Sequence, residues 1–222
     1  MSVPTFTLSD GSKVPALAWG NVRPFPSLPP HSSHQSHLLV RTQGSGNARK
    51  TALESGVLAI KAGIRHIDTA QGYYNEEETG KSIQQGTQQA GISVADIYVT
   101  TKGERTSAFF VPVTVQLTYA PCSATVSTEG GDPNAAGIAL EDLRDSVKAS
   151  LARLGRQPDL LLVHNPFVPP KGRLVEFWQI LEQLKDDGTI TASLGVSNFR
   201  PQVRLSLPPG LGSLPLSEKC PR

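Results

Sequence analysis

One stretch of sequence decides the fold: His66-Ile-Asp-Thr-Ala-Gln-Gly-Tyr-Tyr-Asn-Glu-Glu-Glu-Thr-Gly80, which joins a short apolar strand to a helix through a polar turn. We predict the strand over residues 65–70 and the helix from Asn75 to about Gln85. Three glutamates fall in the first turn of this helix, where carboxylates suit the positive end of the helix dipole. Units of this kind, repeated along a chain, build a parallel sheet flanked by helices.

The same alternation continues on both sides of this stretch. Apolar residues at helical spacing, each group followed by a glycine, predict helices near residues 53–64, 140–154 and 174–184. Apolar runs predict strands at 97–101, 160–164 and 191–197, after an N-terminal hairpin around Asp10-Gly11 and a buried strand Val14–Trp19. This order fits an open doubly wound sheet or a (β/α) barrel, and both place active sites at the carboxyl ends of their strands.

Two stretches interrupt the pattern. Residues 22–43 mix prolines, histidines and serines without a helical or strand period, and the stretch from about 103 to 136 is also irregular. Residues 201–222 are again rich in proline, serine and leucine. We therefore predict one domain over 1–200 with insertions at 22–43 and 103–136, followed by an irregular tail.

Composition sets broad limits on function. The 222 residues suffice for one sizeable core, and a formal net charge of +2 gives no strong attraction to nucleic acid or a membrane surface. No apolar run approaches the roughly 20 residues that span a bilayer, and no leader pattern opens the chain. Cys122 and Cys220 stand far apart and indicate no disulfide framework. We expect a cytoplasmic protein without nucleic-acid or membrane partners, whose oligomeric state stays unknown.

Chemically useful residues follow several predicted strands. Asp68, Lys102 and His164 each end a different strand, and Tyr73 lies in the loop after Asp68. Because the ends of parallel strands converge on one rim, we expect these side chains to meet. An ammonium beside a phenol lowers the pKa of the phenol, and a histidine can donate to an oxygen that gains negative charge. Such a set can protonate a carbonyl oxygen, with hydride supplied by a cofactor.

Four motifs in this order resemble the aldo-keto reductase family. The stretch His66–Gly80 is similar to the family signature around its catalytic aspartate and tyrosine. Tyr98–Lys102 and Asp159–Pro166 resemble the strands that end in its catalytic lysine and histidine. Gly195–Phe199 resembles the segment that holds the nicotinamide carboxamide, and the style of the motifs is closest to fungal ketoreductases.

The resemblance implies a reaction, a cofactor and a fold. An aldehyde or ketone, as small-molecule substrate, would be reduced to an alcohol by hydride from NADPH, without metal. Tyr73, five residues after Asp68, would be the general acid; Tyr74 would not. Asp68 and Lys102 would tune the tyrosine, and His164 would orient the carbonyl. The implied cofactor-binding residues are Ser197, Asn198, Gly20 and Asp68. The implied fold is an incomplete (β/α)8 TIM barrel of about five parallel strands with an N-terminal hairpin.

The same residues allow other interpretations. Tyr98 and Lys102 have the spacing of the short-chain dehydrogenase pair, but their segment is strand-like and no Gly-rich Rossmann motif opens the chain. His31, His34 and His37 have a spacing that suits a metal, but the prolines and serines around them fix no ligand geometry.

Further alternatives concern the class of protein. A metal-dependent barrel hydrolase is disfavoured, since the strand ends offer one histidine and one aspartate, with a lysine where a third ligand is needed. A non-catalytic binding or regulatory relative, such as the potassium-channel β subunit built on the same barrel, is the alternative function. Trp19 either lines the substrate pocket or packs in the core.

The chain departs from the family in its strand count. A full barrel has eight strands in typically about 250 residues, and we count five here. We therefore expect a C-terminally truncated member, without the later residues that grip the cofactor and with weak or no turnover. We also hypothesise that residues 22–43, about 103–136 and 203–222 are translated introns. They begin with Val-Arg or Gly-Glu-Arg, which are the residues that a GT-type splice donor encodes when it is translated.

Overall fold

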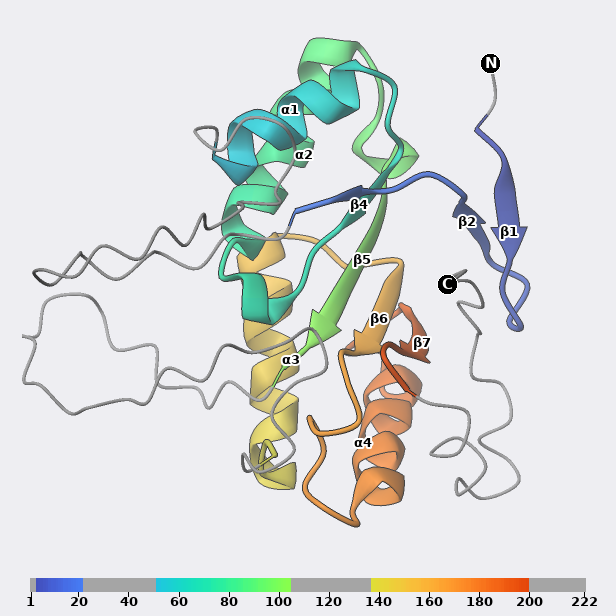
Figure 1. The fold of residues 1–222 in the computed structure, drawn as a ribbon, viewed down its shortest axis with the longest axis vertical. Helices are drawn as coiled ribbons and strands as arrows, with labels where there is room; N and C mark the ends of the chain where they lie inside the picture. Colours follow the sequence, from blue (N-terminus) through green and yellow to red (C-terminus); the bar gives the residue numbers. More distant parts are fainter. Residues whose placement is uncertain (1–2, 22–50, 105–136, 200–222) are drawn as a thin grey trace, which may run out of the picture.

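The structure is a computed structural model that describes residues 3–21, 51–104 and 137–199 (Figure 1). The predicted insertion 22–43, nearly all of 103–136 and the tail 201–222 lie outside the described residues. The intron hypothesis and the histidines at 31, 34 and 37 therefore stay predictions.

Short strands alternate with helices along the described chain. The strands are β1 Thr5–Thr7, β2 Lys13–Pro15, β3 Trp19–Gly20, β4 His66–Asp68, β5 Tyr98–Gly103, β6 Leu160–Val163 and β7 Ser193–Val196. The helices are α1 Ala52–Lys61, α2 Glu76–Ala90, α3 Leu140–Leu154 and α4 Leu174–Asp186, with the 3-10 turns η1 Gln71–Tyr73 and η2 Val94–Asp96.

The main sheet is parallel and wound in one direction. Its strands lie in the order β3-β4-β5-β6-β7, which is their order in the chain. A doubly wound sheet reverses its strand order at a switch point, and this sheet does not. The described strands therefore form an incomplete (β/α)8 barrel, which confirms the barrel prediction over its alternative.

The amino-terminal segment differs from the sequence prediction. The buried strand expected at Val14–Trp19 is wrong, because the segment divides into two strands of different sheets. Strand β2 pairs only with β1, in an antiparallel hairpin that leaves its side chains partly exposed. Strand β3 pairs with β4 through Trp19 and Ile67, and so opens the main sheet.

Strand β5 and helix α2 extend beyond the ends predicted from the sequence. Strand β5 continues beyond the predicted end at residue 101, because Lys102 and Gly103 still pair with β6. Helix α2 continues past Gln85 to Ala90, where Gly91 with φ +67° provides the left-handed residue that ends it.

Two apolar clusters hold the helices on the outer face of the sheet. One gathers buried residues of α1, α2, β4 and β5, and Trp19 packs against it. This contact favours the core interpretation of Trp19. The larger cluster joins α3 and α4 to β6 and β7 through Phe177, Leu161 and Leu194, among others. Figure 1 shows these helices along the sheet and the β1–β2 hairpin standing apart from them.

Polar contacts attach the hairpin to the amino ends of the strands. The hydroxyl of Ser193 donates to Asp10, and the hydrogen bonds from Ser193 and Ser12 lower the pKa of Asp10 to about 2. The Nδ1 atom of His66 lies 3.2 Å from the carbonyl oxygen of Pro15. Because that oxygen can only accept, Nδ1 carries the proton.

No helix in residues 3–21, 51–104 and 137–199 is both long and apolar enough to span a membrane.

Candidate active site

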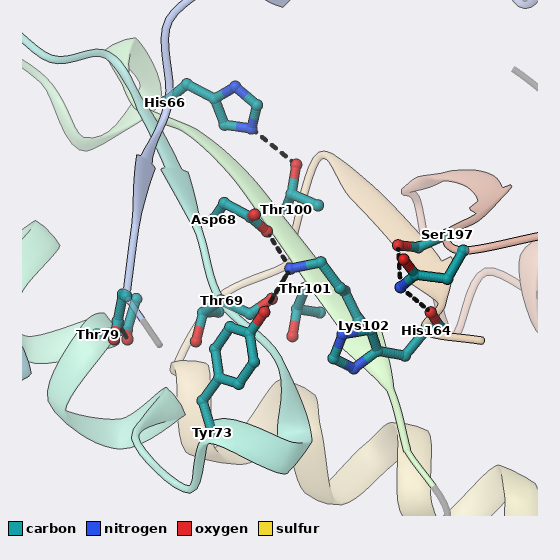
Figure 2. Close-up of polar contacts among 12 residues, drawn as sticks. His66, Asp68, Thr69, Tyr73, Thr79, Thr100, Thr101, Lys102, His164 and Ser197 are labelled. Carbon is teal, nitrogen blue, oxygen red and sulfur yellow. Dashed lines mark hydrogen bonds and ion pairs between the residues drawn. The ribbon is translucent and has the colours of Figure 1, made fainter. Parts of the chain in front are cut away.

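The carboxyl ends of the strands bring the predicted residues together on one rim (Figure 2). Asp68 ends β4, Lys102 lies near the end of β5, and His164 directly follows β6. Tyr73 ends the 3-10 turn η1, which follows β4. The close-up shows the Lys102 ammonium between the Asp68 carboxylate and the Tyr73 hydroxyl, with the His164 ring beside Tyr73.

Lys102 is the centre of the polar contacts. Its side chain is buried, and its Nζ atom donates to Asp68 Oδ1 at 2.5 Å, to the carbonyl oxygen of Thr69 at 3.0 Å and to Tyr73 OH at 3.4 Å. A buried ammonium needs a countercharge and acceptors for all three protons, and these partners supply both. The ammonium is therefore held within reach of the phenol.

Tyr73 differs from the expectation in its acidity. Burial raises the pKa of its phenol above the ordinary value, and the charge of nearby Lys102 opposes that shift only in part. From the sequence only the Lys102 ammonium could be considered, and its charge lowers the pKa of the phenol. The phenol is therefore protonated at neutral pH and can serve as a proton donor.

Tyr74 occupies a different environment from its neighbour. It is 66% exposed and adopts the left-handed conformation with φ +54° at the end of η1. Its side chain is therefore largely in contact with solvent, whereas Tyr73 faces Lys102 (Figure 2). The choice of Tyr73 over Tyr74 as the general acid stays a prediction.

His164 has two neighbours at the rim. Its ring meets the Tyr73 ring edge-on, with 5.7 Å between the centroids. Its Nδ1 atom lies against Oε1 of Glu104, a contact that is an ion pair only when the ring is protonated. Sequence reasoning missed Glu104, because it was assigned to an irregular insertion. The alternation of side chains along a strand would have found it, since Glu104 lies two residues after Lys102.

The proposed cofactor residues flank this group. Asn198 has φ +59°, and its amide nitrogen donates to the carbonyl oxygen of His164 at 3.0 Å and to Ser197 Oγ at 3.1 Å. Gly20 pairs with Asp68 across β3 and β4, and a Cβ added to Gly20 would meet no atom of the described residues within 4 Å. An amide, a hydroxyl and open space above a glycine suit a flat carboxamide-bearing ring.

Buried amides support the rim from below, and sequence reasoning did not identify them. Asn75 Nδ2 donates to the carbonyl oxygen of Asn21 at 2.7 Å, and Thr69 Oγ1 donates to Asn75 Oδ1 at 3.2 Å. The backbone N–H of Asn21 donates to the carbonyl oxygen of Asp68 at 3.1 Å. These bonds fix the end of β3 to the end of β4 and to the start of α2.

The competing residue patterns do not form sites in the described part of the chain. Tyr98 and Lys102 lie about 13 Å apart along β5 at about 3.3 Å per residue. Burial raises the pKa of Tyr98 to about 12. Residues 3–21, 51–104 and 137–199 hold no group of three or more His, Cys, Asp or Glu side chains placed to bind a metal ion.

Comparisons with known proteins identify the family. Residues 39–206 match the Aldo/keto reductase family, so the chain belongs to it. An aldo-keto reductase of Mycobacterium sp. strain KMS is 29% identical over 203 residues, covering 91% of this chain and 52% of that protein. An uncharacterised oxidoreductase of Schizosaccharomyces pombe is 31% identical over 141 residues, covering 64% of this chain and 38% of that protein. The chain spans about half the length of the curated relatives it matches.

Solved structures agree with this assignment. An aldo-keto reductase complexed with NADPH superposes with a TM-score of 0.60 at 25% identity, covering 94% of this chain and 53% of that one. An aldo/keto reductase of Brucella melitensis gives a TM-score of 0.52 at 30% identity, covering 90% and 54%. Since the relatives include bacterial and yeast proteins, the closer affinity to fungal ketoreductases stays a prediction.

Proposed function

We propose that the chain carries the acid–base group of an NADPH-dependent reductase, which converts an aldehyde or ketone to an alcohol with Tyr73 as general acid. One observation carries this proposal: a half-buried phenol lies 3.4 Å from a buried ammonium, which is itself paired with Asp68. Family membership and the likeness to a reductase complexed with NADPH support the choice of reaction and of cofactor.

The residues of the rim divide the reaction among them. The carbonyl oxygen of the substrate accepts hydrogen bonds from Tyr73 OH and from the His164 ring. NADPH, when bound, would supply the hydride that the carbonyl carbon accepts. As the oxygen gains negative charge, Tyr73 transfers its proton to that oxygen, and the phenolate left behind is stabilised by the Lys102 ammonium. Asp68 holds Lys102 in place and balances its charge.

Ser197, Asn198 and Gly20 are the residues that we propose to hold the cofactor, together with Asp68. The Asn198 amide and the Ser197 hydroxyl are the hydrogen-bonding groups for the nicotinamide carboxamide. Gly20 carries no side chain at the end of β3, and among the described residues no atom lies within 4 Å of an added Cβ, which supports this role.

We also propose that turnover by this chain alone is weak. Within the described residues β3 and β7 each pair on one side only, so the rim is not closed into a ring. Open strand edges favour association with other chains, and we expect an open rim to bind the cofactor weakly. The cytosol is the compartment that we propose, where NADPH and small carbonyl substrates are both available.

Two measurements on the purified chain test the proposal. A fluorescence titration with NADPH asks whether the cofactor binds, and analysis of a generic aldehyde after incubation with NADPH asks whether alcohol forms. Binding with slow alcohol formation supports the reductase. Binding without any alcohol supports the non-catalytic alternative, and no binding contradicts the reductase.

A further inference from the structure

Gln71 is a buried side chain of the rim that the proposed reaction does not use. It begins the 3-10 turn η1, two residues before Tyr73, and only 5% of it is exposed. Its Nε2 atom donates to the carbonyl oxygen of Ser146 at 3.0 Å and to Ser146 Oγ at 3.2 Å, both in α3. Its Oε1 atom accepts the backbone N–H of Glu104 at 2.8 Å. One amide therefore joins the turn that carries Tyr73 to helix α3 and to the end of β5.

These two attachments require an amide. The bond to the Ser146 carbonyl needs a donor, and the bond to the Glu104 N–H needs an acceptor. A glutamine side chain presents both, whereas a carboxylate lacks the donor and an aliphatic side chain lacks both. Loss of either partner leaves a buried polar group unsatisfied.

The turn η1 is short and is held by its contacts with neighbouring elements. A 3-10 turn of three residues has poor hydrogen-bond geometry and depends on its surroundings. Among the described residues, the Tyr73 hydroxyl receives one long hydrogen bond, from Lys102 at 3.4 Å. The turn also packs closely on the chain after β5, since a Cβ added to Gly72 would lie 2.9 Å from Cγ of Glu104. The position of Tyr73 is therefore set mainly by where η1 is anchored.

We propose that Gln71 is a positioning residue, which fixes the Tyr73 phenol relative to Lys102 and His164. The inference rests on the proposed role of Tyr73 as general acid. Gln71 does not contact the reacting atoms in this account. It acts through the backbone of η1, by holding that turn against β5, which carries Lys102.

Two variants and a matched control test this role. Gln71→Leu removes both attachments at nearly the same volume, and Gln71→Glu keeps the acceptor for Glu104 while it removes the donor to Ser146. The control is Gln157→Leu. Gln157 also bridges two backbone groups, since it donates to the carbonyl oxygen of Thr189 at 3.0 Å and accepts the N–H of Thr191 at 3.3 Å. That bridge lies at the amino end of β7, away from the rim.

The first readout is structural and needs neither cofactor nor substrate. NMR cross-relaxation between the ring protons of Tyr73 and His164 reports the contact whose centroids lie 5.7 Å apart. We expect this signal to weaken in both Gln71 variants and to persist in Gln157→Leu. The second readout is turnover, in which kcat should fall about tenfold or more with KM nearly unchanged, because about 1 Å of misplacement can cost about a hundredfold.

The outcomes separate this inference from the proposed function. If the wild-type chain forms no alcohol, the proposed function fails, and the ring contact still decides whether Gln71 places Tyr73. If Gln71→Leu does not fold, Gln71→Glu decides the same question. An unchanged ring contact in a folded Gln71 variant, or an equal loss in Gln157→Leu, overturns the inference.

Discussion

Glu76 offers the sharpest test of how the rim is supported from the helices. Its carboxylate is 1% exposed at the start of α2, and four donors converge on it. Arg153 donates through Nε at 2.8 Å and makes an ion pair through Nη2 at 2.7 Å, Thr101 Oγ1 donates at 2.8 Å, and Ser150 Oγ also donates. This one side chain connects α2 to α3 and to β5, at the residue before Lys102.

Glu76→Gln keeps the shape of the side chain but has a single acceptor oxygen and places an NH2 group among donors. Hydrogen bonds to charged groups contribute about 1.5–3 kcal/mol each, and breaking a buried ion pair costs about 3–5 kcal/mol. The hydroxyls of Thr101 and Ser150 can turn to other acceptors, and the Arg153 side chain is 44% exposed, so its charge stays partly hydrated. We therefore expect a loss of about 2–4 kcal/mol in the free energy of unfolding.

Urea unfolding followed by circular dichroism measures this loss. With an m-value of about 2 kcal/mol per molar, a loss of about 3 kcal/mol lowers the midpoint by about 1.5 M. The matched control is Glu77→Gln, one residue along the same helix, where the carboxylate is exposed and pairs with Lys81 across one turn. Its midpoint should barely move, because exposed pairs contribute little. Equal shifts for Glu76→Gln and Glu77→Gln would refute this reasoning.

Three further predictions follow from single residues. Burial lowers the pKa of His66, so its contribution to folding stability is present above the unfolded pKa of about 6.5 and is lost as the pH falls below that value. Between about pH 8 and pH 5 the urea midpoint should therefore fall more in the wild type than in His66→Gln. Equal falls in the two proteins contradict this. Gly80→Ala would place a Cβ 2.3 Å from the carbonyl oxygen of Leu154, so it should lower unfolding stability by about 1–3 kcal/mol, and by more than Gly86→Ala, which meets a movable isoleucine side chain. Asn198→Ala should weaken NADPH binding about threefold to tenfold by fluorescence titration, in line with one lost hydrogen bond, and unchanged affinity removes it from the proposed site.

The sequence was sufficient for the fold and for the convergence at the rim. Alternation of strands and helices predicts a parallel sheet. The carboxyl ends of the strands in such a sheet all lie at the same edge. Asp68, Lys102 and His164 could therefore be placed on one rim without knowledge of any contact. The hairpin was harder to place, because a run of apolar residues from 14 to 19 does not show where one sheet ends and another begins.

Contacts between distant residues and the effects of burial could not be predicted. Gln71 and Ser146 meet across 75 positions of sequence, and nothing in the local pattern marks either residue. Glu76 was expected to suit the helix dipole in the first turn of its helix, and nothing in the sequence indicated that it is also buried among donors. The pKa of Tyr73 was expected to fall beside Lys102, but burial raises it, and burial depends on packing that only the structure shows.

One measurement tests the central claim most directly: single-turnover reduction of a reactive aldehyde by NADPH, with protein in molar excess, in the wild type, Tyr73→Phe and Tyr74→Phe. Molar excess makes even slow turnover measurable. If Tyr73 is the general acid, Tyr73→Phe slows alcohol formation by about 10²–10⁴-fold. Tyr74→Phe then reacts like the wild type. Alcohol formation at the wild-type rate in Tyr73→Phe, or its loss in Tyr74→Phe instead, would contradict the account.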